Sequence, residues 1–107
     1  YPVNVERSLI ELSERLEAEV EIFAEVSIKR AENEAQYKLS YNRTIVRMTD
    51  GTVTLKEATA QVRAAQEFRE WKISESMEKA TQQRLISIRT QIESLRTISA
   101  NVRAAAS

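Results

Sequence analysis

Glycine and proline are almost absent from this 107-residue chain, and this absence constrains its fold more than any other feature. Pro2 lies at the start and Gly51 near the middle, so the stretches 3–50 and 52–107 lack both residues that most often interrupt a helix. In the segment TDGTVT (49–54), glycine supplies the left-handed backbone that commonly ends a helix. The sequence therefore predicts an all-α protein in which two long helices fold back on each other at Gly51.

The expected boundaries follow from this turn and from local capping signals. The first helix covers about residues 4–48, the turn 49–54, and the second helix about residues 55–105. Thr54 begins the second helix as the N-cap of a Thr-x-x-Glu capping box. The whole chain (1–107) then forms a single domain, a long antiparallel helical hairpin.

Apolar side chains recur at steps of three and four in both predicted helices, which is the spacing of one helical face. In the first helix this seam comprises Leu9, Leu12, Leu16, Val20, Phe23, Ala24, Ile28, Ala31, Ala35, Leu39, Asn42 and Val46. In the second helix a heptad seam comprises Leu85, Ile88, Ile92, Leu95, Ser99 and Val102. We expect the two seams to pack against each other.

Further apolar side chains lie outside these seams, at Ile10, Ile22, Val26, Ile86 and Ile98. Two paired helices leave one side of each helix uncovered, so an apolar stripe wider than the seam needs another partner. We therefore expect a homo-oligomer that forms a coiled coil or a helical bundle. Its expected interface residues are Leu85, Ile88, Ile92, Leu95, Val102 and Trp71.

Charge is segregated along a formally neutral chain. Residues 1–34 carry nine acidic and four basic side chains, whereas residues 81–107 carry four basic side chains and one acidic. Folding at Gly51 places position i beside position ~103 minus i, so these two blocks face each other. The basic side chains closest to the turn have no facing acidic block. They are Lys38, Arg43, Arg47, Lys56 and Arg63.

Two tyrosines lie among these basic side chains. Tyr37 and Tyr41 are four residues apart and share a helical face beside Lys38 and Arg43. Proteins that bind single strands combine backbone-tracking cations with aromatic rings on which bases stack. The predicted nucleic-acid site comprises Tyr37, Lys38, Tyr41, Arg43, Arg47, Lys56 and Arg63. The alternative is that both tyrosines pack in a helix interface with their hydroxyl groups in water.

The sequence contains neither cysteine nor histidine, which removes thiolate nucleophiles, imidazole bases and the usual zinc ligands. No glycine-rich phosphate loop is present. We therefore expect no enzymatic activity, no cofactor and no metal site. No apolar run approaches the ~18 residues of a membrane span, and no export signal opens the chain, so we expect a cytoplasmic protein without a membrane partner.

Three segments resemble small helical phage proteins of replication and recombination clusters: EAQYKLSYNR (34–43), DGTVT (50–54) and LRTISANVRA (95–104). The layout is similar to that of UvsY-type recombination mediators. The resemblance implies an oligomeric accessory protein of the bacterial host cytoplasm that binds single-stranded DNA. Such proteins help a RecA-like recombinase to displace single-strand-binding protein and assemble on DNA.

In that family the basic residues that contact DNA lie in a helical Lys-x-Arg segment followed by aromatic residues. The nearest match is Lys38 with Tyr37, Tyr41 and Arg43, although Ser40 stands where the family has its second base. A different class of function remains open, namely a structural coiled-coil oligomer such as a phage assembly or scaffold component. In such a protein the bases and aromatic residues would only stabilise the helix pair.

Overall fold

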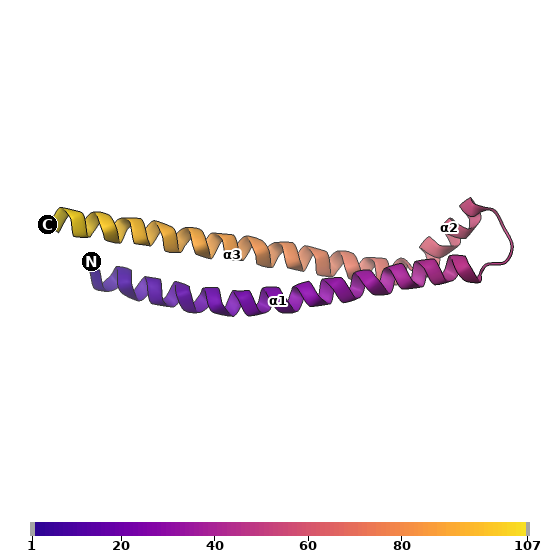
Figure 1. Cartoon of the computed structure of the whole chain (residues 1–107), viewed down its shortest axis with the longest axis horizontal. Coiled ribbons are helices and arrows are strands. Elements are labelled where there is room, and N and C mark those ends of the chain that lie inside the picture. Colours follow the sequence, from indigo (N-terminus) through magenta and orange to yellow (C-terminus); the bar gives the residue numbers. More distant parts are fainter. Residues whose placement is uncertain (1, 107) are drawn as a thin grey trace. The chain divides into compact units, whose positions relative to one another are not determined.

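The computed structural model describes residues 2–106, and these residues form three α-helices without any strand (Figure 1). Helix α1 spans Pro2–Arg47, α2 spans Val53–Arg63 and α3 spans Ala65–Ala106. The all-α prediction is confirmed. The expected single second helix over 55–105 is wrong, because a break at Ala64 divides it into α2 and α3.

The turn between α1 and α2 forms at the predicted glycine. Gly51 has a φ of +109°, and a Cβ at this position would lie 2.9 Å from the Cδ2 atom of Leu55. Only glycine adopts such a backbone without strain. Thr52, and not Thr54, caps α2: its backbone is extended and its hydroxyl accepts the Leu55 N–H at 3.1 Å. Thr54 lies inside α2.

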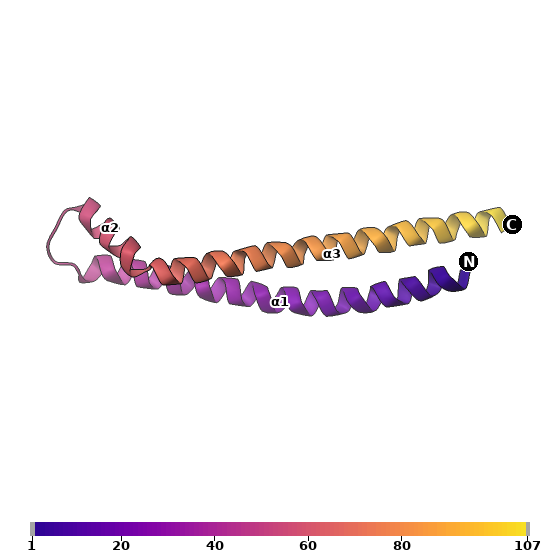
Figure 2. The ribbon, with the colours of Figure 1, turned by 180° about the vertical axis from the view of Figure 1, so that it is seen from behind.

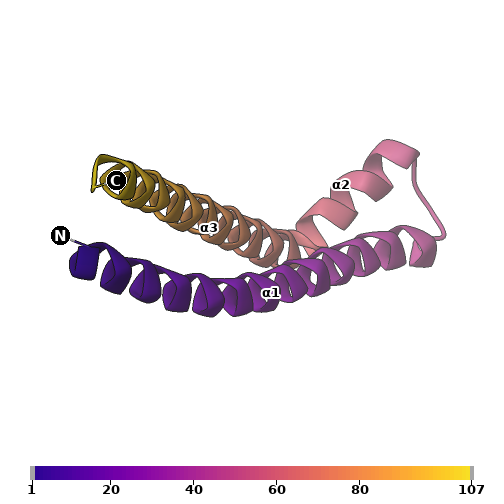
Figure 3. The same cartoon turned by 60° about the vertical axis from the view of Figure 1, so that its left-hand side comes forward.

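The break between α2 and α3 occurs without glycine or proline. Ala64 has φ −94° and ψ 10°, which ends the regular geometry of α2, and α3 then continues in a different direction (Figure 3). Hydrogen bonds persist on both sides, from Ala64 N–H to the Ala60 carbonyl and from Phe68 N–H to the Ala64 carbonyl, each 2.9 Å. Ala60 and Ala64 are fully buried, so the bend lies where two small side chains pack closely.

The chain divides into two compact units. We call residues 1–24 with 79–107 the terminal unit, and residues 25–78 the turn unit. In the terminal unit the first part of α1 and the last part of α3 lie side by side and run in opposite directions (Figures 1 and 2). The turn unit contains the rest of α1, all of α2 and the first part of α3.

The terminal unit has an apolar core. Leu12, Ile88 and Ile92 are buried, and three half-buried leucines, Leu9, Leu16 and Leu95, pack against them. Arg84 Nε donates to both carboxylate oxygens of Glu19 at 3.2–3.3 Å. Arg84 is the residue that the predicted register places opposite Glu19, so this part of the predicted register is confirmed.

Most of the side chains expected at an oligomer interface lie inside this core. Leu85, Ile88, Ile92 and Leu95 belong to the intrachain interface of α1 and α3, and Ile88 is only 2% exposed. They are therefore occupied within one chain. The predicted outlying residues Ile10, Ile22, Ile86 and Ile98 are exposed, whereas Val26 is half-buried.

The turn unit has a polar seam where the sequence predicted an apolar one. On α1 the buried or half-buried positions include Arg30, Asn33, Tyr37 and Thr44, which continue the heptad spacing of the terminal unit. The predicted seam faces solvent instead: Ile28 is 60% exposed and Val46 is 82% exposed, and Ala31, Ala35, Leu39 and Asn42 are exposed as well. Two predicted seam residues of the terminal unit, Val20 and Ala24, are also exposed. Two of the polar seam residues have partners on α3, since Arg30 bonds to Glu78 and the Asn33 amide donates to the Glu70 carbonyl at 3.3 Å.

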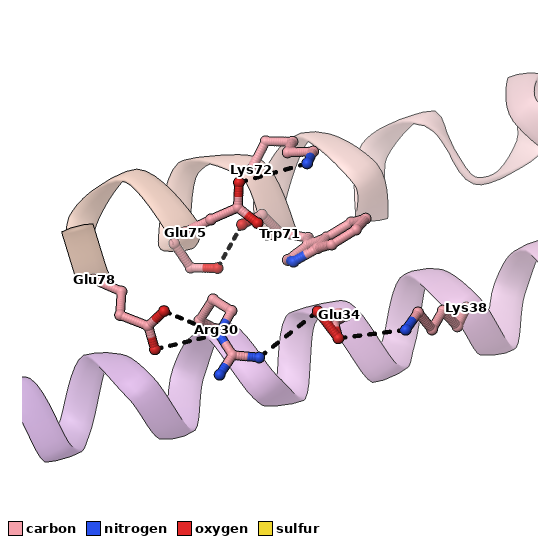
Figure 4. A network of polar contacts seen from close by, with 8 residues as sticks. Arg30, Glu34, Lys38, Trp71, Lys72, Glu75 and Glu78 are labelled. Carbon is pink, nitrogen blue, oxygen red and sulfur yellow. Dashed lines mark hydrogen bonds and ion pairs between the residues drawn. The ribbon is translucent and has the colours of Figure 1, made fainter.

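The best-defined of these partners form an ion pair (Figure 4). Arg30 Nε donates to both carboxylate oxygens of Glu78 at 3.2 Å, and Arg30 Nη1 lies 3.7 Å from Glu34 Oε1. The buried hydroxyls bond to their own helices, with Thr44 Oγ1 2.9 Å from the Ser40 carbonyl and Ser74 Oγ 2.8 Å from the Trp71 carbonyl. Each of these polar groups therefore has a partner, as burial requires.

Candidate nucleic-acid interface

A groove of about 300 Å³ in the turn unit gathers three arginines. Arg43 and Arg47 come from α1, four residues apart and therefore on one face of the helix. Arg63 is the last residue of α2, and Glu67 lies in the first turn of α3. We call this the arginine groove. Its remaining lining residues are Gln36, Leu39, Ser40 and Thr44.

The three guanidinium groups are unpaired. Within residues 2–106, none of them makes an ion pair or a side-chain hydrogen bond, and all three side chains are exposed. Several bases elsewhere in the turn unit are neutralised, as Arg30 is by Glu78 and Lys72 is by Glu75 at 3.5 Å. Unpaired guanidinium groups that converge on one groove form a natural binding site for phosphate oxygens.

Glu67 is the acidic residue of the groove, and its environment is unusual. Its Oε2 atom is buried and has no hydrogen-bond partner among residues 2–106. A buried carboxylate oxygen without a donor costs free energy, since it has lost water without replacement. The carboxylate also reduces the positive charge of the groove. Sequence reasoning missed Glu67, although its position four residues after Arg63 was a usable signal for a shared surface.

Two of the basic side chains predicted for the site lie outside the arginine groove. Lys38 Nζ is 3.4 Å from Glu34 Oε2 on the same helix (Figure 4), which provides a local counterion. Lys56 is half-buried on α2 and is not a lining residue. The structure therefore brings together Arg43, Arg47 and Arg63 from the predicted set of five.

The two predicted tyrosines belong to an aromatic cluster between α1 and α3. The Tyr37 ring stacks on Trp71 with a centroid distance of 5.3 Å and an interplanar angle of 25°, and it meets Phe68 at 5.3 Å. Tyr41 lies 5.9 Å from Tyr37. Lys72 Nζ lies 4.3 Å from the Trp71 ring centroid, within cation–π range. Both tyrosines are half-buried, which matches the packing alternative.

Trp71, predicted as an oligomer anchor, is a member of this intrachain cluster. It is half-buried, and its Nε1 donor is buried without an acceptor. Figure 4 shows the indole ring on the side of α3 that faces α1. The ring is thus committed to the helix interface of the turn unit.

A second, smaller pocket of about 260 Å³ adjoins the aromatic cluster. It is lined by Tyr37 of α1, Gln61 of α2 and Phe68 of α3, and we call it the aromatic pocket. Phe68 remains 42% exposed despite its contacts with Tyr37 and Trp71. Sequence reasoning missed Gln61, because no local pattern shows that α2 bends at Ala64 and returns to Tyr37.

Among residues 2–106, no group of three acidic side chains is arranged to bind a metal ion. None of the helices there combines the length and the apolar character needed to cross a bilayer.

Comparison with known proteins identifies no relative. No protein-family model matches the sequence, and neither the curated proteins nor the solved structures include a significant match.

Proposed function

We propose that this chain is a single-stranded-DNA-binding accessory protein of phage replication and recombination, and that its arginine groove binds the phosphate backbone. The observation that supports this proposal is the convergence of Arg43, Arg47 and Arg63, none of which makes an ion pair within residues 2–106. The function is binding and not catalysis.

The chemistry of guanidinium suits a phosphate backbone. Its planar fork donates two parallel hydrogen bonds to a phosphate, and it stays charged at any physiological pH. Such contacts recognise the backbone without selecting a sequence. An accessory protein that acts wherever single strands are exposed requires this tolerance.

The more specific role as a recombination mediator rests on the resemblance of residues 34–43, 50–54 and 95–104 to UvsY-type proteins. In that role the protein helps a RecA-like recombinase to displace single-strand-binding protein. A homo-oligomer suits the role, because several arginine grooves on one strand multiply a modest single-site affinity.

A second candidate is a structural oligomer of the phage assembly or scaffold class. It is favoured by the exposed apolar side chains of the turn unit, where Ile28, Leu39 and Val46 lie on α1, and Ile73 and Met77 lie on α3. Exposed apolar side chains of this kind are available to contact another protein or another copy, and a contiguous patch of them would mark such a surface. On this alternative the chain self-associates and does not bind DNA.

Fluorescence anisotropy with a labelled oligo-dT at low and moderate salt separates the two candidates. We expect binding at low salt that weakens as salt rises, because each neutralised phosphate releases counterions. For three contacts on a single strand, the slope of log K against log salt should be about −2. Absence of binding at low salt, together with self-association in sedimentation, would favour the structural candidate.

A further inference from the structure

We propose that the aromatic pocket receives one unpaired base of the bound strand, which makes the protein selective for single-stranded over duplex nucleic acid. This inference rests on the proposed function for the phosphate contacts. It adds a base site formed by Tyr37, Gln61 and Phe68.

The first support is the lining of the aromatic pocket. Two of its three side chains are aromatic rings, and Phe68 keeps 42% of its surface exposed. Aromatic rings bind bases through their π faces, and this contact tolerates all four bases. The volume of about 260 Å³ lies below the range of pockets for drug-sized ligands, so the pocket suits one ring system and not a larger molecule.

The second support is the amide of Gln61. An amide carries a donor and an acceptor side by side, and it can rotate to exchange them. Each base presents a donor next to an acceptor on its Watson–Crick edge: N6–H and N1 in adenine, N4–H and N3 in cytosine, N1–H and O6 in guanine, N3–H and O4 in thymine. Gln61 can therefore bind any unpaired base, whereas pairing in a duplex occupies this edge.

The third support is placement. Gln61 and Arg63 are two residues apart on α2, and Phe68 follows Glu67 directly on α3. The same three helices therefore supply both the arginine groove and the aromatic pocket within the turn unit. A flexible strand with phosphates in the groove can turn an unpaired base toward the aromatic pocket, whereas the stacked and paired bases of a duplex are not free to leave the helix.

Trp71 provides a built-in reporter for this base site. It is the only tryptophan of the chain, and its ring lies 5.3 Å from Tyr37 and 5.9 Å from Phe68. A base inserted against these two rings changes the environment of the indole. We therefore expect the emission of Trp71 to change when a strand with bases binds.

The test compares three ligands of equal length: oligo-dT, an abasic strand with the same phosphates, and a DNA duplex. We expect oligo-dT to bind about 5- to 150-fold more tightly than the abasic strand, which is the affinity expected from one stacked base. We expect the emission of Trp71 to change with oligo-dT only. The duplex should resemble the abasic strand.

Variants place the effect at the aromatic pocket. Gln61 is exposed, so Gln61→Ala should fold normally and should reduce the advantage of oligo-dT over the abasic strand without weakening the abasic strand. Phe68→Leu should reduce the same advantage further. Gln83→Ala, at an exposed position of the terminal unit, is the matched control and should leave all affinities unchanged.

The outcomes separate the two proposals. Equal affinity for oligo-dT and the abasic strand, with constant Trp71 emission, would overturn the base site and leave the phosphate groove intact. Equal affinity for duplex and single strand would also overturn it. Failure of all three ligands to bind at low salt would remove the proposed function and the base site together.

Discussion

In the terminal unit, α1 and α3 meet through leucine and isoleucine, whereas in the turn unit α1 and α3 meet through an ion pair and aromatic rings. The heptad spacing is the same in both units, so the difference lies in the side chains that occupy it. A fully buried isoleucine contributes about 1.5–3 kcal/mol through removal from water. A partly exposed ion pair contributes far less, commonly ~1 kcal/mol or below.

This contrast suggests a division of labour between the units. Stability comes mainly from the terminal unit, where Leu12, Ile88 and Ile92 are buried. The turn unit carries the arginine groove and the aromatic pocket. A unit with fewer buried apolar groups has side chains available for a ligand.

The largest effect is expected in the terminal unit. Ile88→Ala should lower the free energy of unfolding by about 2–5 kcal/mol, because it removes buried methylene groups and leaves a cavity. Ile98→Ala is the matched control, since Ile98 is exposed in the same unit and on the same helix, and it should cost no more than ~0.5 kcal/mol. Urea denaturation followed by circular dichroism measures both. Equal losses would contradict the assignment of the core.

A smaller effect is expected for the ion pair of the turn unit. Glu78→Leu leaves Arg30 without its main partner in a half-buried place and should cost about 1–3 kcal/mol. Adding Arg30→Leu should recover most of this loss, because two apolar side chains of suitable size pack where the ion pair was. Urea denaturation of the single and double variants gives the comparison. A double variant as unstable as Glu78→Leu would show that the pair does more than satisfy its own charges.

The smallest effect concerns the affinity of the arginine groove. Glu67→Gln removes the carboxylate that lies among the three arginines and should strengthen binding of oligo-dT about 3- to 10-fold at low salt. The gain should shrink as salt rises, because the groove is open to solvent. Anisotropy at two salt concentrations measures it. An unchanged or weaker affinity would place the strand away from Glu67.

The sequence allowed the turn to be located but not the helix break. Gly51 could be found because only glycine suits its backbone. The bend at Ala64 lacks glycine and proline, and alanine is the best helix former. No local sequence signal therefore predicts a helix break at this position. The cap was assigned to Thr54 because the Thr-x-x-Glu pattern begins there, whereas the extended backbone that a cap requires occurs at Thr52.

The seam of α1 was predicted correctly at Leu9, Leu12 and Leu16, but Val20 is 46% exposed and Glu19 pairs with Arg84 instead. Beyond residue 24 the apolar pattern predicts Ile28, Leu39 and Val46 at the interface. These three residues are exposed, and Arg30 and Thr44 occupy the interface instead. A polar residue can be predicted at the helix interface only when its partner on the other helix is known, as Glu78 is the partner of Arg30. The same reason explains the site. Three of the five predicted basic residues converge, and Gln61 could not be found from local sequence, whereas the spacing of Glu67 from Arg63 was a usable signal.

The most direct test of the division between the units compares two variants of equal charge. One replaces Arg43, Arg47 and Arg63 by Gln in the turn unit, and the other replaces the exposed Arg7, Arg89 and Arg96 by Gln in the terminal unit. We expect the first variant to bind labelled oligo-dT at least ~10-fold more weakly and to lose most of the salt dependence, with unchanged helicity. The second variant should bind like the unmodified protein. Equal weakening of both would show that overall charge, and not the arginine groove, attracts the strand.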